Sequence, residues 1–177
     1  MLYADFSVYT LIVIMSALLH ETGHLVFMKI FGVRIYSVTV FPFGAVIRSD
    51  AAALPYKREA TVAFAGAGVN IVCAAISGIA YMFVPGIALQ FICVCNLFLA
   101  LINLVPVKTL DGGRILFSLL CCRMLPEKAQ EYSDFISYLS FIFLVIASLA
   151  LLTVTGYNFS LVIFSLCIFI CTYVHRT

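Results

Sequence analysis

Charged side chains are scarce in this sequence, and their scarcity sets the class of protein. Only 10% of the 177 residues are Asp, Glu, Lys or Arg, and the mean hydropathy is +1.17. Soluble domains carry roughly 25% charged residues. The composition therefore excludes an ordinary soluble domain and predicts an integral membrane protein. The net charge of +2 is too small to indicate nucleic-acid binding.

Other absences narrow the class further. A cleaved signal peptide begins with Lys or Arg, but the first such residue here is Lys29, so we expect the first apolar segment to be retained. The seven cysteines lack the paired C-x-x-C spacing of a zinc ribbon, and we expect them to be reduced and to pack as small core residues. The sequence contains no internal repeat and no low-complexity tract.

Within this apolar background, one segment carries a cluster of ionisable groups. From Phe6 to Met28, apart from the phenol of Tyr9, the ionisable residues are His20, Glu21 and His24. A hydrocarbon environment penalises such groups by several kcal/mol, roughly 2.5–3.5 for a charged side chain at mid-membrane. Their presence therefore indicates function.

The spacing of these three residues is that of His-Glu-x-x-His. On a helix, His20 and His24 lie on one face and can bind one metal ion together. Glu21 follows the first ligand, where it can reach a water molecule and act as general base. The alternative is a pair of buried histidines that are hydrogen-bonded to a neighbouring helix.

The apolar pattern predicts an all-α polytopic membrane protein with about five transmembrane helices and a short membrane-associated β-hairpin after the first. We expect one domain over residues 1–177, with a core at 6–124 and accessory helices at 135–174. The expected spans are 6–30, 60–84, a third that starts at 87 and becomes irregular at 103, 135–154 and 159–174. The polar stretch 123–134 is expected to connect the last two spans to the core.

The expected hairpin, residues 33–48, is β-branched and aromatic, with a break at Pro42 to Gly44. An unpaired strand edge is not tolerated in lipid, so the hairpin is expected to lie against protein or a watery cavity. Its edge could hold an unwound substrate by strand addition. The candidate substrate-binding residues on it are Val38, Val40, Phe43 and Gly44.

The third span is interrupted by Pro106 and by a pair of glycines, and such irregular backbone at membrane depth is tolerated where it lines a cavity. Catalytic zinc takes three protein ligands, and Asp111 is the strongest candidate for the third. Alternatively, Asp111 caps a helix that starts at Gly112, or pairs with Arg114. We expect Lys108 and Arg114 to extend toward a head-group face.

Two asparagines lie in the apolar spans. Gly66 and Gly68 permit close helix approach, and Asn70 beside them either forms a hydrogen bond across helices or faces the substrate. Asn103 either satisfies backbone groups that Pro106 leaves unpaired or faces the substrate.

Basic residues in the loops predict the orientation. The turns after the second and fourth spans have none. The basic residues follow the first span, the third span and the last span: Arg34, Arg48, Lys57, Arg58, Arg123, Lys128 and Arg176. The N-terminus is therefore expected outside and the C-terminus in the cytoplasm. The segment that carries His20 and His24 and the segment that carries Asp111 are then both expected to approach the cytoplasmic side.

The sequence resembles the site-2 protease family of intramembrane zinc metalloproteases. Three segments, in this order, carry the resemblance: His20–His24, Gly66–Asn70 and Asn103–Gly112. The resemblance implies a Zn2+ ion held by His20, His24 and Asp111, with Glu21 as catalytic base. It also implies cleavage of a membrane-associated protein substrate near the cytoplasmic face. A membrane protein partner is expected to regulate this cleavage.

Within that family, the turn from Phe41 to Gly44 looks most like the sporulation branch, which processes the precursor of a mother-cell sigma factor. This implies a bacterial cytoplasmic membrane or the membrane that surrounds the forespore. Ala67 departs from the family pattern, which has proline there. The other classes considered are a non-catalytic relative that serves as an interaction module and a metal or proton transporter. Nothing in the sequence indicates an oligomeric state.

Overall fold

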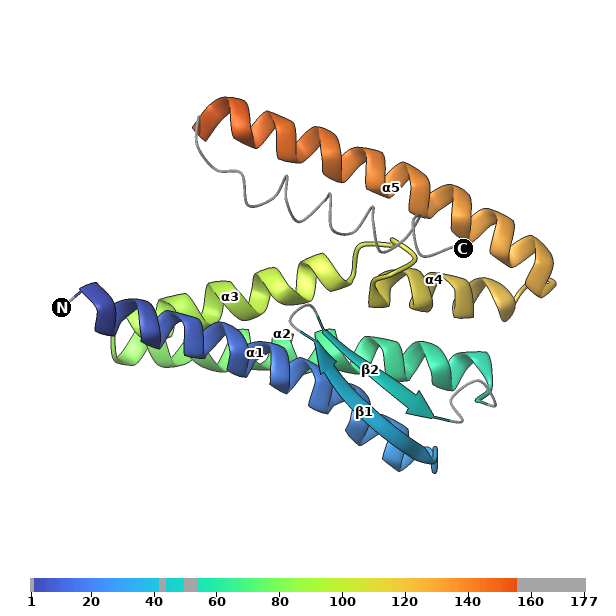
Figure 1. Ribbon diagram of the computed structural model, residues 1–177, viewed down its shortest axis with the longest axis horizontal. Coiled ribbons are helices and arrows are strands. Elements are labelled where there is room, and N and C mark those ends of the chain that lie inside the picture. Colours follow the sequence, from blue (N-terminus) through green and yellow to red (C-terminus); the bar gives the residue numbers. More distant parts are fainter. Residues whose placement is uncertain (1, 42–43, 50–53, 156–177) are drawn as a thin grey trace. The chain divides into compact units, whose positions relative to one another are not determined.

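The computed structural model of the chain describes residues 2–41, 44–49 and 54–155. The chain divides into two compact units, Met1–Leu104 and Val105–Thr177. The first contains α1 (Leu2–Ile30), β1 (Ile35–Phe41), β2 (Gly44–Ser49), α2 (Tyr56–Phe83) and α3 (Ile87–Asn103). The described part of the second contains α4 (Asp111–Cys121) and α5 (Pro126–Thr155). Figure 1 shows the seven elements.

Among the described residues, three helices are long and apolar enough to cross a membrane: Val8–Ile30, Tyr56–Phe83 and Pro126–Thr153. The expected third span is present as the 17-residue helix α3, which ends at Asn103, where the sequence predicted an irregular segment. The expected span at 159–174 lies outside the described residues.

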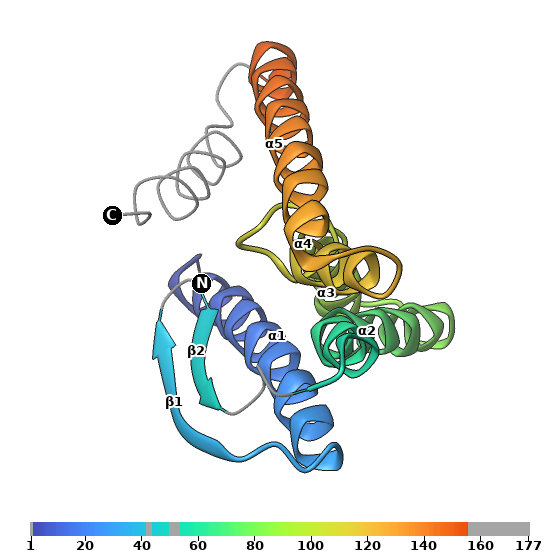
Figure 2. The same cartoon turned by 90° about the vertical axis from the view of Figure 1, so that its right-hand side faces the viewer.

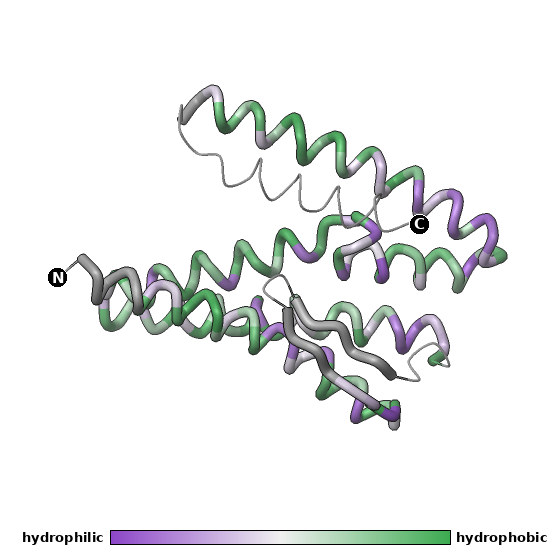
Figure 3. Tube along the Cα trace, viewed as in Figure 1, coloured by the Kyte–Doolittle hydropathy of each residue, from purple (hydrophilic) through white to green (hydrophobic). Residues whose placement is uncertain are grey.

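One expectation is wrong. Residues 126–134 were expected to lie in a polar connector, yet they form the first turns of α5. Glu, Lys, Ala and Gln dominate this stretch and favour a helix regardless of polarity. Figure 3 shows the first turns of α5, like those of α2, as hydrophilic, with mostly hydrophobic residues after them.

In the first unit, α2 packs against both α1 and α3 (Figures 1 and 2). Small residues allow this close packing. A Cβ atom placed on Gly23 of α1 would come within 2.7 Å of the carbonyl oxygen of Ala65 on α2. The buried face of α2 consists mainly of small residues: Ala60, Val62, Ala63, Ala65, Gly66, Ala67, Asn70, Ala74 and Ser77. Without a hydrophobic driving force in lipid, such close approach is what holds helices together.

A glycine turn connects α1 to the two strands. Gly32 has φ of 74°, its N–H bonds the carbonyl of Lys29, and the N–H of Val33 bonds the carbonyl of Met28. This is the Schellman arrangement, which requires a left-handed residue after the helix. β1 and β2 then pair antiparallel, with Val40 opposite Ala45 and Phe41 opposite Gly44. β2 contacts α1.

The distribution of polarity is the reverse of that in a soluble domain. Met82 and Phe83 of α2 are 79% and 80% exposed, whereas Ser16, Asn70 and Asn96 are 3% exposed or less. Apolar side chains face outward because lipid solvates them, and polar groups are confined to helix contacts. One such contact joins α1 to α3, because the side-chain amide of Asn96 donates to Ser16 Oγ at 3.0 Å.

This contact gives a testable prediction. Asn96→Leu keeps the volume but leaves the buried Ser16 hydroxyl without its donor, so we expect the free energy of unfolding to fall by about 1–2 kcal/mol. Unfolding in mixed micelles with SDS measures the change. Ser77→Ala is the matched control, because within the described part of the chain the Ser77 hydroxyl bonds only carbonyls of its own helix, Cys73 at 2.8 Å and Ala74 at 3.1 Å. Equal losses in the two variants would contradict the prediction.

Candidate metal centre

His20 and His24 lie on the buried stripe of α1, which repeats every three to four residues. The stripe continues through Ser16, Gly23 and Met28. The two histidines are 5% and 4% exposed. A single helix face thus carries both imidazoles into the packed interior of the first unit.

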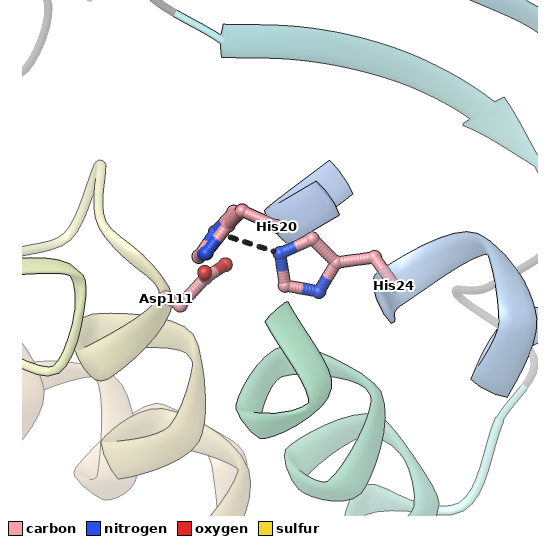
Figure 4. A group of neighbouring side chains, drawn as sticks. All are labelled: His20, His24 and Asp111. Atoms are coloured by element: carbon pink, nitrogen blue, oxygen red, sulfur yellow. Dashed lines mark hydrogen bonds between the residues drawn. The ribbon is translucent and has the colours of Figure 1, made fainter. Parts of the chain in front are cut away.

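The two rings face each other through their Nε2 atoms, which are 3.2 Å apart (Figure 4). The Nδ1 atom of His24 lies 2.8 Å from the carbonyl oxygen of Val62 on α2. A carbonyl only accepts, so Nδ1 carries the hydrogen and donates it. In neutral His24 the Nε2 lone pair is then directed toward His20, and His20 Nε2–H fills the gap between the rings.

This arrangement fits a metal ion. Zinc binds imidazole nitrogen at about 2.0–2.1 Å, and a tetrahedral angle then separates two such nitrogens by about 3.3 Å. The observed 3.2 Å matches that separation. The bond to Val62 is the outer hydrogen bond that metal-binding histidines usually make, fixing the tautomer and the ring orientation. The alternative, buried histidines that are hydrogen-bonded to a neighbouring helix, explains the bond from His24 Nδ1 to α2. It does not explain why the two Nε2 atoms face each other.

Gly66 provides the space for the rings. A Cβ atom at this position would lie 2.7 Å from His24 Cε1 and 2.8 Å from His20 Cε1. Both rings therefore lie directly on the backbone of α2. The glycine that the sequence marked for close helix approach brings α2 against the imidazoles themselves.

Glu21 occupies the next position of α1, and its side chain is half-buried. At about 100° per residue, it lies about 60° around the helix from His24 and about 100° from His20. It therefore borders the imidazole face, where a proton acceptor can reach a reacting water.

Asp111 belongs to the second unit, where it is the first residue of α4 and is 9% exposed. Leu110 is the N-cap residue, so Asp111 does not cap a helix that starts at Gly112. Arg114 Nη1 is 3.9 Å from Asp111 Oδ1, at the outer limit of an ion pair, as the alternative expected. That Asp111 joins the two histidines stays a prediction.

The two asparagines differ. Asn70 is fully buried on α2, and neither its amide nitrogen nor its carbonyl oxygen has a hydrogen-bond partner among the described residues. The described part of the chain therefore does not contain the expected bond across helices. Asn103 donates to the carbonyl of Leu99, one turn back in α3, so its amide supports its own helix end.

The substrate-binding candidates on the hairpin are only partly described. Val38 and Val40 lie in β1, opposite Ile47 and Ala45, and Gly44 begins β2. Phe43 lies outside the described residues. The role of all four as substrate contacts stays a prediction.

Sequence reasoning missed two groups next to the histidine pair. Ser16 lies one turn before His20 on the same stripe and accepts a hydrogen bond from Asn96 of α3, and its spacing of four residues was a readable signal. The carbonyl of Val62 is a backbone group and leaves no trace in the residue type.

Comparison with known proteins gives one family match. The family model described as Peptidase family M50 matches residues 8–88 and 87–147. The chain is also similar to zinc metalloprotease MJ0392 of Methanocaldococcus jannaschii, with 31% identity over 115 residues, 62% of this chain and 33% of that protein. It is 34% identical over 108 residues to Rip3 of Mycobacterium tuberculosis, also named as a zinc metalloprotease, covering 56% of this chain and 28% of Rip3. The chain thus spans about a third of the length of these relatives.

A solved structure is similar as well. The site-2 protease from Methanocaldococcus jannaschii superposes with a TM-score of 0.70 and 26% sequence identity. The match covers 92% of this chain and 74% of that one.

The contact of Gly66 with both rings predicts the effect of a single methyl group. Gly66→Ala should weaken zinc binding at least tenfold, because the new Cβ displaces both imidazoles. Chelator competition on the purified protein measures the affinity. Gly68→Ala is the matched control, since its Cβ would meet only Phe64, at an ordinary 3.5 Å. Wild-type affinity in the Gly66 variant would refute the contact.

Proposed function

Because the chain belongs to peptidase family M50, the site-2 protease family, we propose that it is an intramembrane zinc metalloendopeptidase. It hydrolyses a peptide bond in or near a membrane segment of a substrate protein. The family resemblance that the sequence suggested is confirmed, and so is the expectation of zinc chemistry, since the relatives are named zinc metalloproteases. The three apolar helices and the family make the chain an integral membrane protein.

One observation carries this proposal: two buried imidazoles present their Nε2 atoms to each other at 3.2 Å, with the Nδ1 of His24 held by Val62. Asp111 is the proposed third ligand, and the three are the residues labelled in Figure 4. Asp111 is buried at the start of α4, and its carboxylate is a suitable third ligand for zinc. Two imidazoles and one carboxylate form a common donor set for catalytic zinc.

The residues of the chain perform the remaining chemistry. A zinc ion bound at this site supplies Lewis acidity toward a peptide carbonyl and toward water. Glu21 accepts the proton of the attacking water and then delivers it to the leaving amine nitrogen. Its position beside His24, with a half-buried side chain, suits both transfers.

Substrate binding is assigned to two places. Asn70 has an amide that is fully buried and has no partner among the described residues, so a substrate backbone group would satisfy it. The antiparallel strands offer main-chain groups to an unwound substrate by strand addition. Asn103 contributes less, because its amide already bonds Leu99.

The finer assignments follow from the sequence. The N-terminus lies outside and the C-terminus in the cytoplasm, because the basic residues follow the first and third apolar spans. The sporulation branch, a sigma-factor precursor as substrate, a membrane regulatory partner and a bacterial cytoplasmic or forespore-surrounding membrane depend on the resemblance alone and stay predictions.

Glu21→Gln is the decisive variant. It keeps the side chain's size but removes the base, so we expect bound zinc within twofold of wild type and cleavage of a membrane substrate lowered by at least about a hundredfold. Zinc content and cleavage are measured on the same preparation. His20→Ala is the comparison variant, in which both zinc and cleavage are lost. Unchanged cleavage by Glu21→Gln would remove Glu21 as the base, whereas a wild-type protein that binds zinc but cleaves no membrane substrate would favour an interaction module or a transporter.

The hairpin assignment has its own test. Val40→Pro removes one N–H from β1, so we expect cleavage to fall about tenfold or more while zinc binding stays at wild type. Val40→Ala is the control that keeps the N–H, and it should cleave nearly as wild type. Equal cleavage by the two variants would remove strand addition from the mechanism.

A further inference from the structure

The loop that precedes Asp111 is folded tightly against the start of α4. The N–H of Val107 donates to the carbonyl of Val105 at 2.7 Å, and that of Leu110 donates to the carbonyl of Val107 at 2.9 Å. Val107 is fully buried. A Cβ atom on Gly113 would collide with the Val107 carbonyl, so the loop and the first turn of α4 touch backbone to backbone. The shape of this loop therefore sets the direction of Asp111.

α5 holds the same loop through its middle residue, Lys108. The N–H of Lys108 donates to Ser137 Oγ at 2.8 Å. The ammonium group of Lys108 donates to Asp134 Oδ1 at 2.9 Å, and Gln130 Nε2 donates to the same oxygen at 2.8 Å. One residue of the loop is thus bound at its backbone and at its side-chain end by two residues one helical turn apart.

The bond from the Lys108 N–H to Ser137 and the ion pair of Lys108 with Asp134 differ in how strongly they hold the loop. The side chains of Lys108 and Asp134 are 42% and 35% exposed, and ion pairs with that exposure contribute little. Ser137 is 2% exposed, and its hydroxyl satisfies a part-buried peptide N–H that would otherwise lack an acceptor. The backbone bond to Ser137 is therefore the stronger constraint on the loop.

We propose that Ser137 is a positioning residue for the metal centre, with Asp134 in a lesser role. It holds the peptide of Lys108 so that the loop presents Asp111 in the geometry a ligand needs. The inference rests on the proposed function, in which Asp111 is a zinc ligand. It extends the site into α5, a helix expected to serve only as an accessory packing partner.

The test uses the whole 177-residue chain in detergent and measures two properties other than cleavage. Zinc affinity comes from chelator competition, and the visible spectrum of the Co2+-substituted protein reports the ligand geometry. Ser137→Ala should weaken zinc binding about tenfold and change the Co2+ spectrum, because the ligand-bearing loop loses its anchor. Asp134→Asn should weaken binding less than about threefold.

Ser148→Ala is the matched control. Ser148 is also on α5 and is 3% exposed, but its hydroxyl donates to Val145 in its own helix at 2.8 Å. We expect wild-type affinity and spectrum from this variant. If Ser137→Ala also behaves as wild type, or if Ser148→Ala shows the same loss, the positioning role is overturned.

Asp111→Asn separates this inference from the proposed function. Loss of zinc in Asp111→Asn with wild-type binding in Ser137→Ala overturns the positioning role and leaves the ligand assignment standing. Wild-type zinc affinity in Asp111→Asn overturns the ligand assignment, and the role of Ser137 with it.

Discussion

Imidazoles buried in the packed interior of a protein need hydrogen-bond partners, because an unpaired buried polar group is costly. The packing of the first unit follows from this requirement. His24 has its acceptor in a carbonyl of α2, which is within reach only if α1 and α2 lie almost backbone to backbone. That approach requires glycine at Gly23 and Gly66 and a series of alanines along α2. The hydrogen bond of the histidine pair on α1 thus depends on the small residues of α2.

Much of this could be read from the sequence, because the relevant signals are carried by residue type. The His-Glu-x-x-His spacing predicted two imidazoles on one helix face, and they lie there. The Asn103–Pro106 segment predicted the end of a helix, and α3 ends at Asn103. The M50 match confirms the family that these motifs suggested.

The parts that could not be predicted depend on backbone groups or on competing preferences. The Val62 carbonyl has no signature, since every residue carries one. The start of α5 at Pro126 was missed because polarity was taken to indicate a loop, whereas helix propensity prevailed. Ser137 was missed because a serine in an apolar helix looks like packing, and its acceptor role appears only with the N–H of Lys108 beside it.

The bond between His24 and Val62 also limits how a substrate can reach the centre. In a regular helix the carbonyl of residue 62 already accepts from the N–H of residue 66, so this one oxygen serves both the continuity of α2 and the tautomer of His24. Sliding or parting these two helices would let the His24 proton move to Nε2, the atom that faces the other ring. If the histidine pair holds zinc as proposed, a lateral gate at the α1–α2 seam would weaken that binding each time it opened, which favours a passage along some other side.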